Sequence, residues 1–272
     1  MLPTVIRRAP AAMASVRPVL VVAGIGNATG TGGATARLFA KHGYRVALVA
    51  RNADHLNNAA AEINNSGGEA AAFPVKSYTY PEINALFKAI RAHNWPSQAK
   101  AEIRVALWNA SHGVWKNFLD VTEEDVRDSV EGNIVGPFAF SREAILAFKE
   151  NELDDRGRRG TLLFTGATAS IRGNVVTSAF AAGKHALRAL SQSLAKEFGK
   201  QNIHVAHAII DGGILTDRSL SRHEGDAQKE YKNNLDIRLS PESIAESYLY
   251  LTNQDRSAWT WELDLRPAHE KW

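Results

Sequence analysis

The stretch VLVVAGIGNATGTGGATARLFAKHG, residues 19–43, joins an apolar run to a helical pattern through a turn rich in glycine. The apolar run, residues 19–25, is typical of a strand buried on both faces of a parallel sheet. Gly26, Gly30 and Gly32 follow with the spacing GxxxGxG. Glycines at such a turn let the backbone approach a pyrophosphate, and the following helix offers it unpaired N–H groups. We therefore predict a phosphate-binding turn; a tight turn without a ligand is the alternative.

The rest of the chain repeats this alternation of strand and helix. Further apolar or β-branched runs stand at 45–50, 70–75, 102–110, 160–166, 203–210 and 259–265. Helical patterns separate them, the longest covering about 122–150 and 176–199, and a later one starting at the N-cap Ser240 with Pro241 after it. Alternation of this kind predicts an α/β fold: one Rossmann-like, doubly wound domain around a parallel sheet of about seven strands.

The domain is expected to cover residues 18–272, with a flexible extension at 1–17 before it. The extension contains arginine, serine and alanine but no acidic residue, so a weak mitochondrial presequence is the alternative interpretation. The most polar stretch, 217–236, follows the sixth expected strand. Its place after the carboxyl end of a strand favours a lid over a ligand, and a solvated insertion is the alternative.

Composition limits the classes of function. The chain has 272 residues, no cysteine and a formal net charge of +3, and seven arginines and lysines precede the first acidic residue, Asp54. A basic first quarter suits an anionic ligand, and the lack of cysteine fits a reducing compartment. We expect a cytoplasmic protein, with a mitochondrial location as the alternative. The pattern shows no membrane-spanning run, metal-ligand spacing or basic–aromatic motif for nucleic acid.

Arg51 and Asn52 end the second expected strand. An acidic residue there would bind a ribose 2′-hydroxyl, whereas an arginine pairs with a 2′-phosphate. The sequence therefore predicts NADP(H) rather than NAD(H), unless Arg51 is only a solvated surface residue. Lys76, after the third strand, could assist with the same phosphate.

Taken together, these motifs resemble the short-chain dehydrogenase/reductase family over about residues 18–266. WNAS, residues 108–111, stands where that family has Asn-Asn-Ala-Gly, and IIDGGILT, residues 209–216, where it has Pro-Gly before a threonine. Asn133 and Lys184 match two residues of the family's catalytic tetrad. The resemblance implies the following cofactor-binding residues: Gly26, Asn27, Gly30, Thr31, Gly32, Arg51, Asn52, Asn109, Ala110, Lys184, Gly212, Ile214 and Thr216.

Two members of that tetrad are missing. The family's tyrosine and serine, which handle the substrate oxygen, correspond to Phe180 and Ala167. The resemblance implies that Lys184 binds the nicotinamide ribose and that Asn133 holds a water. His112, after the fourth strand, is a candidate replacement acid that we expect to face the cleft, and a histidine that merely lines a loop is the alternative. Lys184 could itself act if its pKa were depressed.

Hydroxyls near the two missing groups offer further candidates, namely Thr168, Ser170 and Ser178, although each is more often a capping or turn residue. Trp108, Trp115 and Phe180 predict an aromatic pocket and hence an apolar or aromatic substrate, with core packing as the alternative for Trp108.

Three functions follow. The first is an NADP(H)-dependent oxidoreductase with an altered proton donor, acting on a hydrophobic or aromatic small molecule. The second is a non-redox cyclase, isomerase or lyase on the same fold, because a fold does not fix a function. The third is a catalytically silent nucleotide-binding protein. The resemblance also implies a homodimer or homotetramer that associates through the helices at about 122–150 and 176–199.

Overall fold

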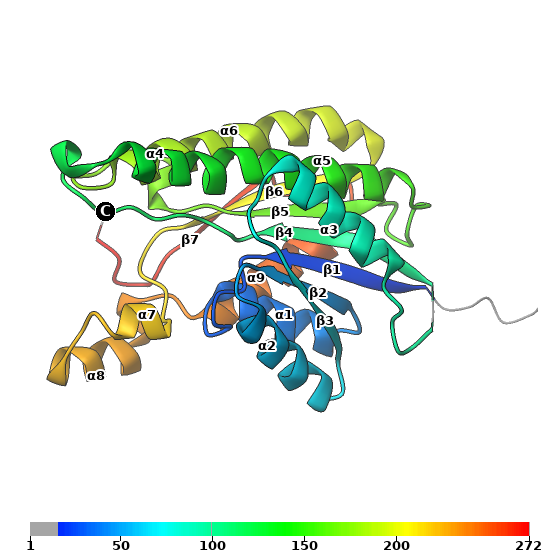
Figure 1. Ribbon diagram of the computed structural model, residues 1–272, viewed down its shortest axis with the longest axis horizontal. Coiled ribbons are helices and arrows are strands. Elements are labelled where there is room, and N and C mark those ends of the chain that lie inside the picture. The colour runs from blue at the N-terminus through cyan, green and yellow to red at the C-terminus, as the bar shows by residue number, and fades with distance from the viewer. Residues whose placement is uncertain (1–15, 99, 272) are drawn as a thin grey trace, which may run out of the picture.

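Seven parallel strands form one sheet in the order β3-β2-β1-β4-β5-β6-β7. The computed structural model describes residues 16–98 and 100–271. Because β1 and β4 are neighbours, the chain winds outward from them in both directions, which is the doubly wound arrangement (Figure 1). The predicted fold class is confirmed. The strands are β1 Arg17–Ala23, β2 Arg45–Ala50, β3 Glu69–Pro74, β4 Ala101–Trp108, β5 Gly160–Thr165, β6 Ile203–Ile210 and β7 Glu262–Leu265.

Helices cover both faces of the sheet. In Figure 1, α3, α5 and α6 lie above the sheet and α1, α2 and α9 below it, and a separate apolar core fills each interface. Every residue of β2 and β6 is buried, which explains why their sequences run without polar alternation. The helices are α1 Thr31–Lys41, α2 Ala53–Asn65, α3 Tyr80–Ala92, α4 Glu123–Val130, α5 Gly136–Lys149, α6 Ser178–Phe198, α7 Asp217–Leu220, α8 Gly225–Asn233 and α9 Pro241–Asn253.

The long helix predicted at about 122–150 is helical from Glu123 to Lys149 but not uniform. A π-helical turn, Glu131–Val135, separates α4 from α5 and contains Asn133. Turns of this kind occur mostly as single insertions in helices, frequently at functional sites. The local widening places Asn133, which is wholly buried, against the end of β4.

Several predicted boundaries shift. The last strand begins at Glu262 rather than 259, because Trp259 instead stacks on His204 with the ring centroids 4.9 Å apart. Ser240 does cap α9, accepting from the backbone N–H groups of Glu242 and Ser243, as predicted. Strand β1 begins at Arg17, the last residue assigned to the extension; the rest of that prediction, apart from residue 16, lies outside the described residues.

The polar segment 217–236 folds into α7 and α8. Figure 1 shows both helices beside the end of the sheet to which the carboxyl ends of the central strands point. In an open α/β sheet, ligands bind at this edge. The placement fits a lid, whereas a role in ligand binding stays a prediction.

Candidate functional site

A cleft of about 1170 Å³ opens at the carboxyl edge of β1, β4, β5 and β6. Its walls come from the glycine-rich turn, from the segments after β4 and β5, from α6 and from α7. The described cleft includes these sequence-predicted residues: Gly26, Asn27, Gly30, Thr31, Gly32, Asn109, Ala167, Phe180, Lys184, Gly212, Ile214 and Thr216. The fold therefore brings together residues that are as far as 190 positions apart in the sequence.

The glycine-rich turn is built for close approach of backbone. Gly26 has φ +61°, and a Cβ on Gly32 would stand 2.5 Å from the carbonyl oxygen of Gly24. Helix α1 starts after Gly30 without a side-chain cap, so its first N–H groups are left for another acceptor. An anionic group such as a pyrophosphate fits this arrangement.

Two glycines that the sequence interpretation passed over complete the turn. Gly24 has φ +96°, and a Cβ there would stand 2.3 Å from the backbone nitrogen of Ala110. A Cβ on Gly33 would lie 2.1 Å from the carbonyl oxygen of Ala28. The signal was present, because Gly24 directly follows a buried strand, but the GxxxGxG pattern alone does not include it.

Asn109 ties the turn to the next strand. Its Nδ2 donates to the carbonyl of Gly24 at 2.7 Å, and its Oδ1 accepts from Thr165 Oγ1 at 2.9 Å. The side chain therefore links the carboxyl ends of β1, β4 and β5. Its described contacts are structural, and direct contact with a cofactor stays a prediction.

Helix α7 is attached to the same turn. Asn27 Nδ2 donates to Asp217 Oδ2 at 2.9 Å, and the backbone N–H of Asp217 donates to Thr29 Oγ1 at 3.3 Å. Thr29 Oγ1 in turn donates to Asn27 Oδ1 at 2.8 Å. Helix α7 is thereby held across the mouth of the phosphate-binding turn.

Three of the predicted cofactor-binding residues are not part of the described cleft wall: Arg51, Asn52 and Ala110. Arg51 is exposed just beyond β2, and Asn52 accepts from the backbone N–H of His55 as the cap of α2. Ala110 packs beneath Gly24. Lys76 is exposed after the neighbouring β3, and Val75, the residue that follows β3, donates its N–H to the carbonyl of Ala50. Arg51 and Lys76 therefore leave adjacent strand ends.

The basic first quarter does not serve one ligand. Arg17 and Arg45 both pair with Glu69, at the start of their strands and therefore at the opposite edge from the cleft. The expectation that these charges gather around an anion is wrong for those two arginines.

Lys184 is buried on α6 and reaches the cleft. Its Nζ donates to the carbonyl of Thr165 at 2.8 Å and lies 5.8 Å from the centroid of the Phe180 ring. Burial lowers the pKa of Lys184 to about 8 from its ordinary 10.5, because the charged form loses its hydration. The ammonium group can therefore exchange a proton near neutral pH.

Asn133 makes three hydrogen bonds. Its Oδ1 accepts from Ser111 Oγ at 2.9 Å, while its Nδ2 donates to the carbonyl of His112 at 3.1 Å and to Ser129 Oγ at 3.2 Å. The side chain is thus occupied in fixing the segment after β4. Its role in holding a water stays a prediction.

The imidazole of His112 turns away from the cleft. Its Nε2 lies 4.0 Å from Asp128 Oδ2 on α4, and the residue is not part of the cleft wall as described. The segment bends at Gly113, where Trp115 folds back. The expectation that His112 faces the cleft is therefore wrong, and its part in proton transfer has no support from this placement.

Aromatic side chains form one end of the cleft. Phe180 and Trp115 lie with ring centroids 5.2 Å apart, and Ala167 stands nearby after β5. Trp108, by contrast, is wholly buried between Tyr78 and Phe140. The prediction that Trp108 lines the pocket is wrong, and its alternative, core packing, is right.

A buried carboxylate stands behind this end of the cleft. Asp211, which is 0% exposed, accepts from Thr168 Oγ1 at 2.5 Å and from Arg172 Nη2 at 3.3 Å, and its other oxygen pairs with Arg266 at 3.4 Å. Thr168 and Arg172 line the cleft. The two other hydroxyl candidates, Ser170 and Ser178, are not part of the described cleft wall. Ser170 is buried, and its Oγ accepts from the backbone N–H of Ala167.

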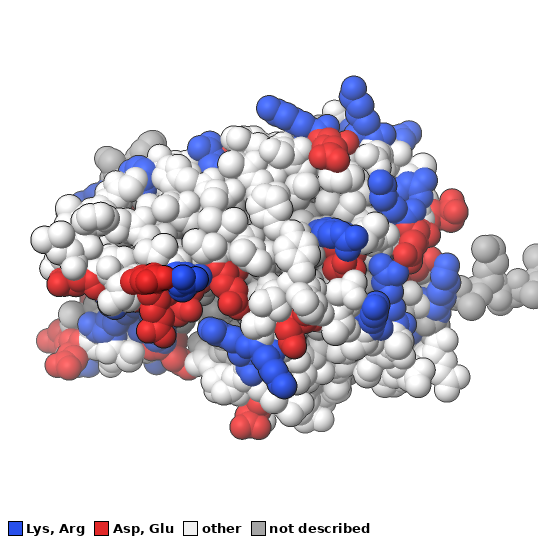
Figure 2. Space-filling view, turned by 45° about the horizontal axis from the view of Figure 1, so that its top comes forward, with Lys and Arg blue, Asp and Glu red and all other residues white. Residues whose placement is uncertain are grey.

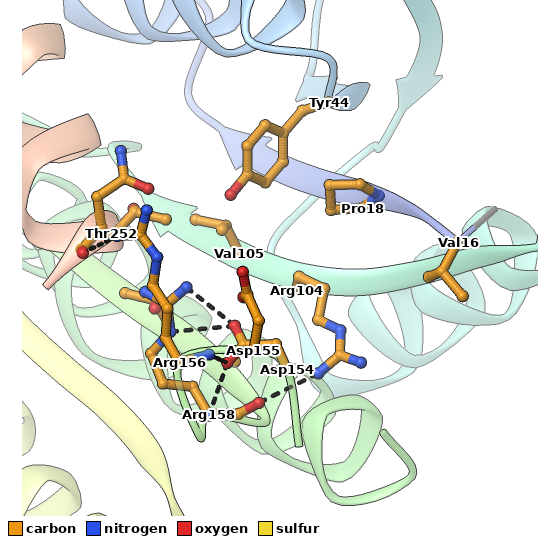
Figure 3. Close-up of a pocket in the computed structure, with 13 residues that line it drawn as sticks. Val16, Pro18, Tyr44, Arg104, Val105, Asp154, Asp155, Arg156, Arg158 and Thr252 are labelled. Atoms are coloured by element: carbon orange, nitrogen blue, oxygen red, sulfur yellow. Dashed lines mark hydrogen bonds and ion pairs between the residues drawn. The ribbon is translucent and has the colours of Figure 1, made fainter. Parts of the chain in front are cut away.

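A second cavity, of about 410 Å³, lies at the opposite edge of the sheet (Figure 3). The picture shows the Tyr44 hydroxyl pointing into it above Val105. Its arginines are mostly engaged within the fold, since Arg158 pairs with Asp154 and Arg104 donates to the carbonyl of Glu152. We therefore place the candidate site in the larger cleft.

Two other kinds of feature, a membrane-spanning helix and a metal site, concern the same described residues. In that part of the chain, none of the helices combines the length and apolarity needed to cross a bilayer. Nor do three or more His, Asp or Glu side chains gather there in a way that could hold a metal ion.

Comparisons with known proteins agree with this geometry. A family model described as short chain dehydrogenase matches residues 19–227. The chain is 24% identical over 249 residues to dehydrogenase/reductase SDR family member 11 of Gallus gallus, which covers 90% of this chain and 94% of that protein. It is 28% identical over 238 residues to carbonyl reductase family member 4 of Xenopus tropicalis, covering 85% and 90%.

Solved structures give the same result. A short-chain dehydrogenase from Rhodopseudomonas palustris is 31% identical and superposes with a TM-score of 0.72 over 92% of this chain and 98% of that chain. Actinorhodin polyketide ketoreductase, solved with NADPH, is 22% identical with a TM-score of 0.78, over 94% and 98%. At that level of identity, the second similarity shows the fold alone.

Proposed function

The chain belongs to the short-chain dehydrogenase family, and from that premise we propose that it is an NADP(H)-dependent oxidoreductase whose proton donor differs from the family's. Its substrate is a small molecule with a hydrophobic or aromatic part, held against Trp115 and Phe180. The alternatives are a non-redox enzyme on the same fold and a silent nucleotide-binding protein.

One observation carries the proposal. Lys184 is buried beside Phe180, in the same cleft as the glycine-rich turn, and its pKa is lowered to about 8. A group with a pKa near the working pH is suited to proton transfer. His112 lies off the cleft, whereas Lys184 lines it, so the geometry favours Lys184 as the donor.

NADPH, when bound, would supply the hydride that reduces a substrate carbonyl carbon. The chain's own task is then to place the carbonyl and to neutralise the oxygen. The Lys184 ammonium, directly or through a water in the space left by the missing tyrosine hydroxyl, gives a proton to the developing alkoxide. Phe180 and Ala167 have no proton to give to the substrate oxygen, so Lys184 is the nearest acid.

The preference for NADP(H) rests on Arg51 and Lys76. Both are exposed, and they leave the adjacent ends of β2 and β3, where a 2′-phosphate would lie if the pyrophosphate occupied the turn after β1. The NADPH in the polyketide ketoreductase structure adds support.

Arg51→Asp should weaken binding of NADPH about tenfold or more, because it replaces attraction to the phosphate by repulsion. Binding of NADH should change little, and fluorescence titration of both cofactors measures the difference. Arg91→Asp, an exposed arginine on α3, serves as the control. Equal loss for both cofactors, or no loss for NADPH, would contradict the assignment.

The proposed reaction is tested with NADPH and a panel of ketones, enones and imines. Absorbance at the nicotinamide band and product mass are followed together across pH. We expect NADPH consumption that falls above pH 8, where Lys184 loses its proton, and that persists in His112→Ala. Turnover without NADPH consumption favours the non-redox alternative, and tight NADPH binding without any turnover favours the silent one.

We also propose a homodimer or homotetramer and a cytoplasmic location. The proposed assembly rests on the exposed apolar side chains of α4 and α5, and the proposed location rests on the absence of cysteine. A mitochondrial location remains the alternative because of the acid-free residues 1–17, and imaging of fusions with and without that segment distinguishes the two.

A further inference from the structure

We propose that the substrate carries a carboxylate as well as an aromatic part, and that Arg222 and Arg172 bind this carboxylate at the aromatic end of the cleft. The inference rests on the proposed function in one respect: it takes the space beside Phe180 as the substrate position. It adds the chemical class of the substrate, which apolar residues alone did not indicate.

Arg222 stands over this end of the cleft. Its guanidinium carbon lies 5.4 Å from the centroid of the Trp115 ring, and Trp115 in turn contacts Phe180. Stacking holds a guanidinium while leaving its N–H groups free at the edge. Among the described residues, no hydrogen bond or ion pair engages those N–H groups. They are therefore available to a ligand.

Arg172 pairs with the buried carboxylate of Asp211. It shares this carboxylate with Thr168 Oγ1 and with Arg266, and Arg266 also pairs with Asp264. The Arg172 side chain is 37% exposed and lines the cleft. Asp211 thus fixes the direction of Arg172, whose guanidinium still reaches the cleft.

The charge of the whole cleft points the same way. Glu270 is the single carboxylate in its described wall, against five cationic side chains: Arg172, Lys184, Arg218, Arg222 and Lys271. Arg218 belongs to α7, which is tied to the phosphate-binding turn, and it suits the cofactor's pyrophosphate. Arg222, Arg172 and Lys271 remain for the substrate, and of these only the two arginines carry a planar guanidinium, which matches a carboxylate with two parallel hydrogen bonds.

A matched pair of ligands tests this. Benzoylformate carries an aromatic ring, a ketone and a carboxylate, and its methyl ester has the same ring and ketone without the charge. Each is titrated into the NADPH-loaded protein by calorimetry. We expect benzoylformate to bind about tenfold or more tightly than the ester, since hydrogen bonds to charged groups are among the strong ones.

Arg222→Met keeps much of the stacking surface and removes one of the two charges, so it should weaken binding of the acid far more than binding of the ester. Arg222→Lys should recover part of the preference, because it restores charge but not the planar fork. Lys229→Met, on the outer surface of α8, is the control and should behave as the wild type.

Equal binding of acid and ester, no binding of either, or an equal loss of both in Arg222→Met would overturn the proposal. Failure of the proposed reaction is a separate result. If the acid binds selectively but NADPH is not consumed, the carboxylate site stands and the redox function does not.

Discussion

Lys184 holds an ammonium group where burial disfavours its charge. Its pKa is about 8 in the folded protein against 10.5 for an ordinary lysine. Below pH 8 the folded state therefore carries a cost of about 3 kcal/mol relative to the unfolded chain. Between pH 8 and 10.5 the unfolded chain holds the extra proton, so this cost is relieved as the pH rises.

Lys184→Met should therefore raise the free energy of unfolding at pH 7 by about 1–3 kcal/mol, less than the full cost because the hydrogen bond to Thr165 is also lost. The gain should shrink between pH 8 and 10.5. Urea unfolding across this range measures it, with the exposed Lys196→Met on the same helix as control. A stability difference that stays constant with pH would contradict the depressed pKa.

Phe180 and Ala167 stand, in our proposal, where the family has two hydroxyls. The Phe180 ring stands 5.8 Å from Lys184 Nζ, so a para hydroxyl would remain in the cleft near the ammonium. Phe180→Tyr with Ala167→Ser should raise ketone reduction about 10²-fold or more, the usual contribution of a positioned acid. NADPH oxidation with the ketone panel measures the gain, and Phe118→Tyr, outside the cleft, is the control. No gain would mean that the substrate geometry has also been lost.

Residues whose roles depend on local spacing could be predicted from the sequence. The glycines of the turn and Lys184 reach the cleft as their spacing indicated. Contacts between distant segments could not be predicted. The bond of Thr168 to Asp211 spans 43 positions, and the rotation of His112 toward Asp128 depends on how α4 packs. Trp108 was misplaced because residues alternate between the two faces of a strand, and the pattern did not say which face its side chain would take.

Helix α7 carries a negative charge against the phosphate-binding turn. Asp217 accepts from Asn27, which belongs to that turn. A bound pyrophosphate would be repelled by this carboxylate, while the amide of Asp217→Asn keeps an oxygen that can accept the same bond. We expect Asp217→Asn to bind NADPH a few times more tightly, corresponding to about 1 kcal/mol for exposed charges near a surface.

The gain from Asp217→Asn should fall at high salt, because mobile ions screen exposed charges. Fluorescence titration of NADPH at low and high ionic strength measures both effects. Asp226→Asn on α8 removes an equally exposed acid that has no contact with the turn, so it should leave the affinity unchanged. If the two variants behave alike, the link between lid and turn has no bearing on the cofactor.

Most helices and strands could be predicted from the sequence. β2 and β6 have the predicted bounds, because fully buried strands give runs of mainly apolar residues. The π-helical turn around Asn133 could not be predicted, since its residues fit an ordinary helix and the extra residue per turn is set by packing. The predicted final strand was too long. Trp259 and Trp261 are residue types that favour strands, but both stand before β7 begins.

Several apolar side chains lie exposed along the outer side of α4 and α5. Val126, Val130 and Phe138 follow one stripe along α4 and α5 and are 45%, 39% and 46% exposed. Figure 2 shows a broad stretch of one face of the molecule without charged side chains, with charged groups gathered toward its edges. Large exposed apolar patches mark interaction surfaces. A second copy of the chain is the occupant we expect, since a two-fold interface pairs the same surface with itself.

Val130→Asp should therefore separate the assembly. Two copies related by a two-fold axis would each bring a buried carboxylate to the interface, at a cost of several kcal/mol. The side chain is already partly exposed in the single chain, so the monomer should stay folded with unchanged circular dichroism. Light scattering should give twice or four times 29.7 kDa for the wild type and about 29.7 kDa for the variant. Tyr250→Asp, on the exposed side of α9 across the sheet, should leave the mass unchanged. A wild-type protein that is already monomeric at micromolar concentration would show that this face serves another purpose.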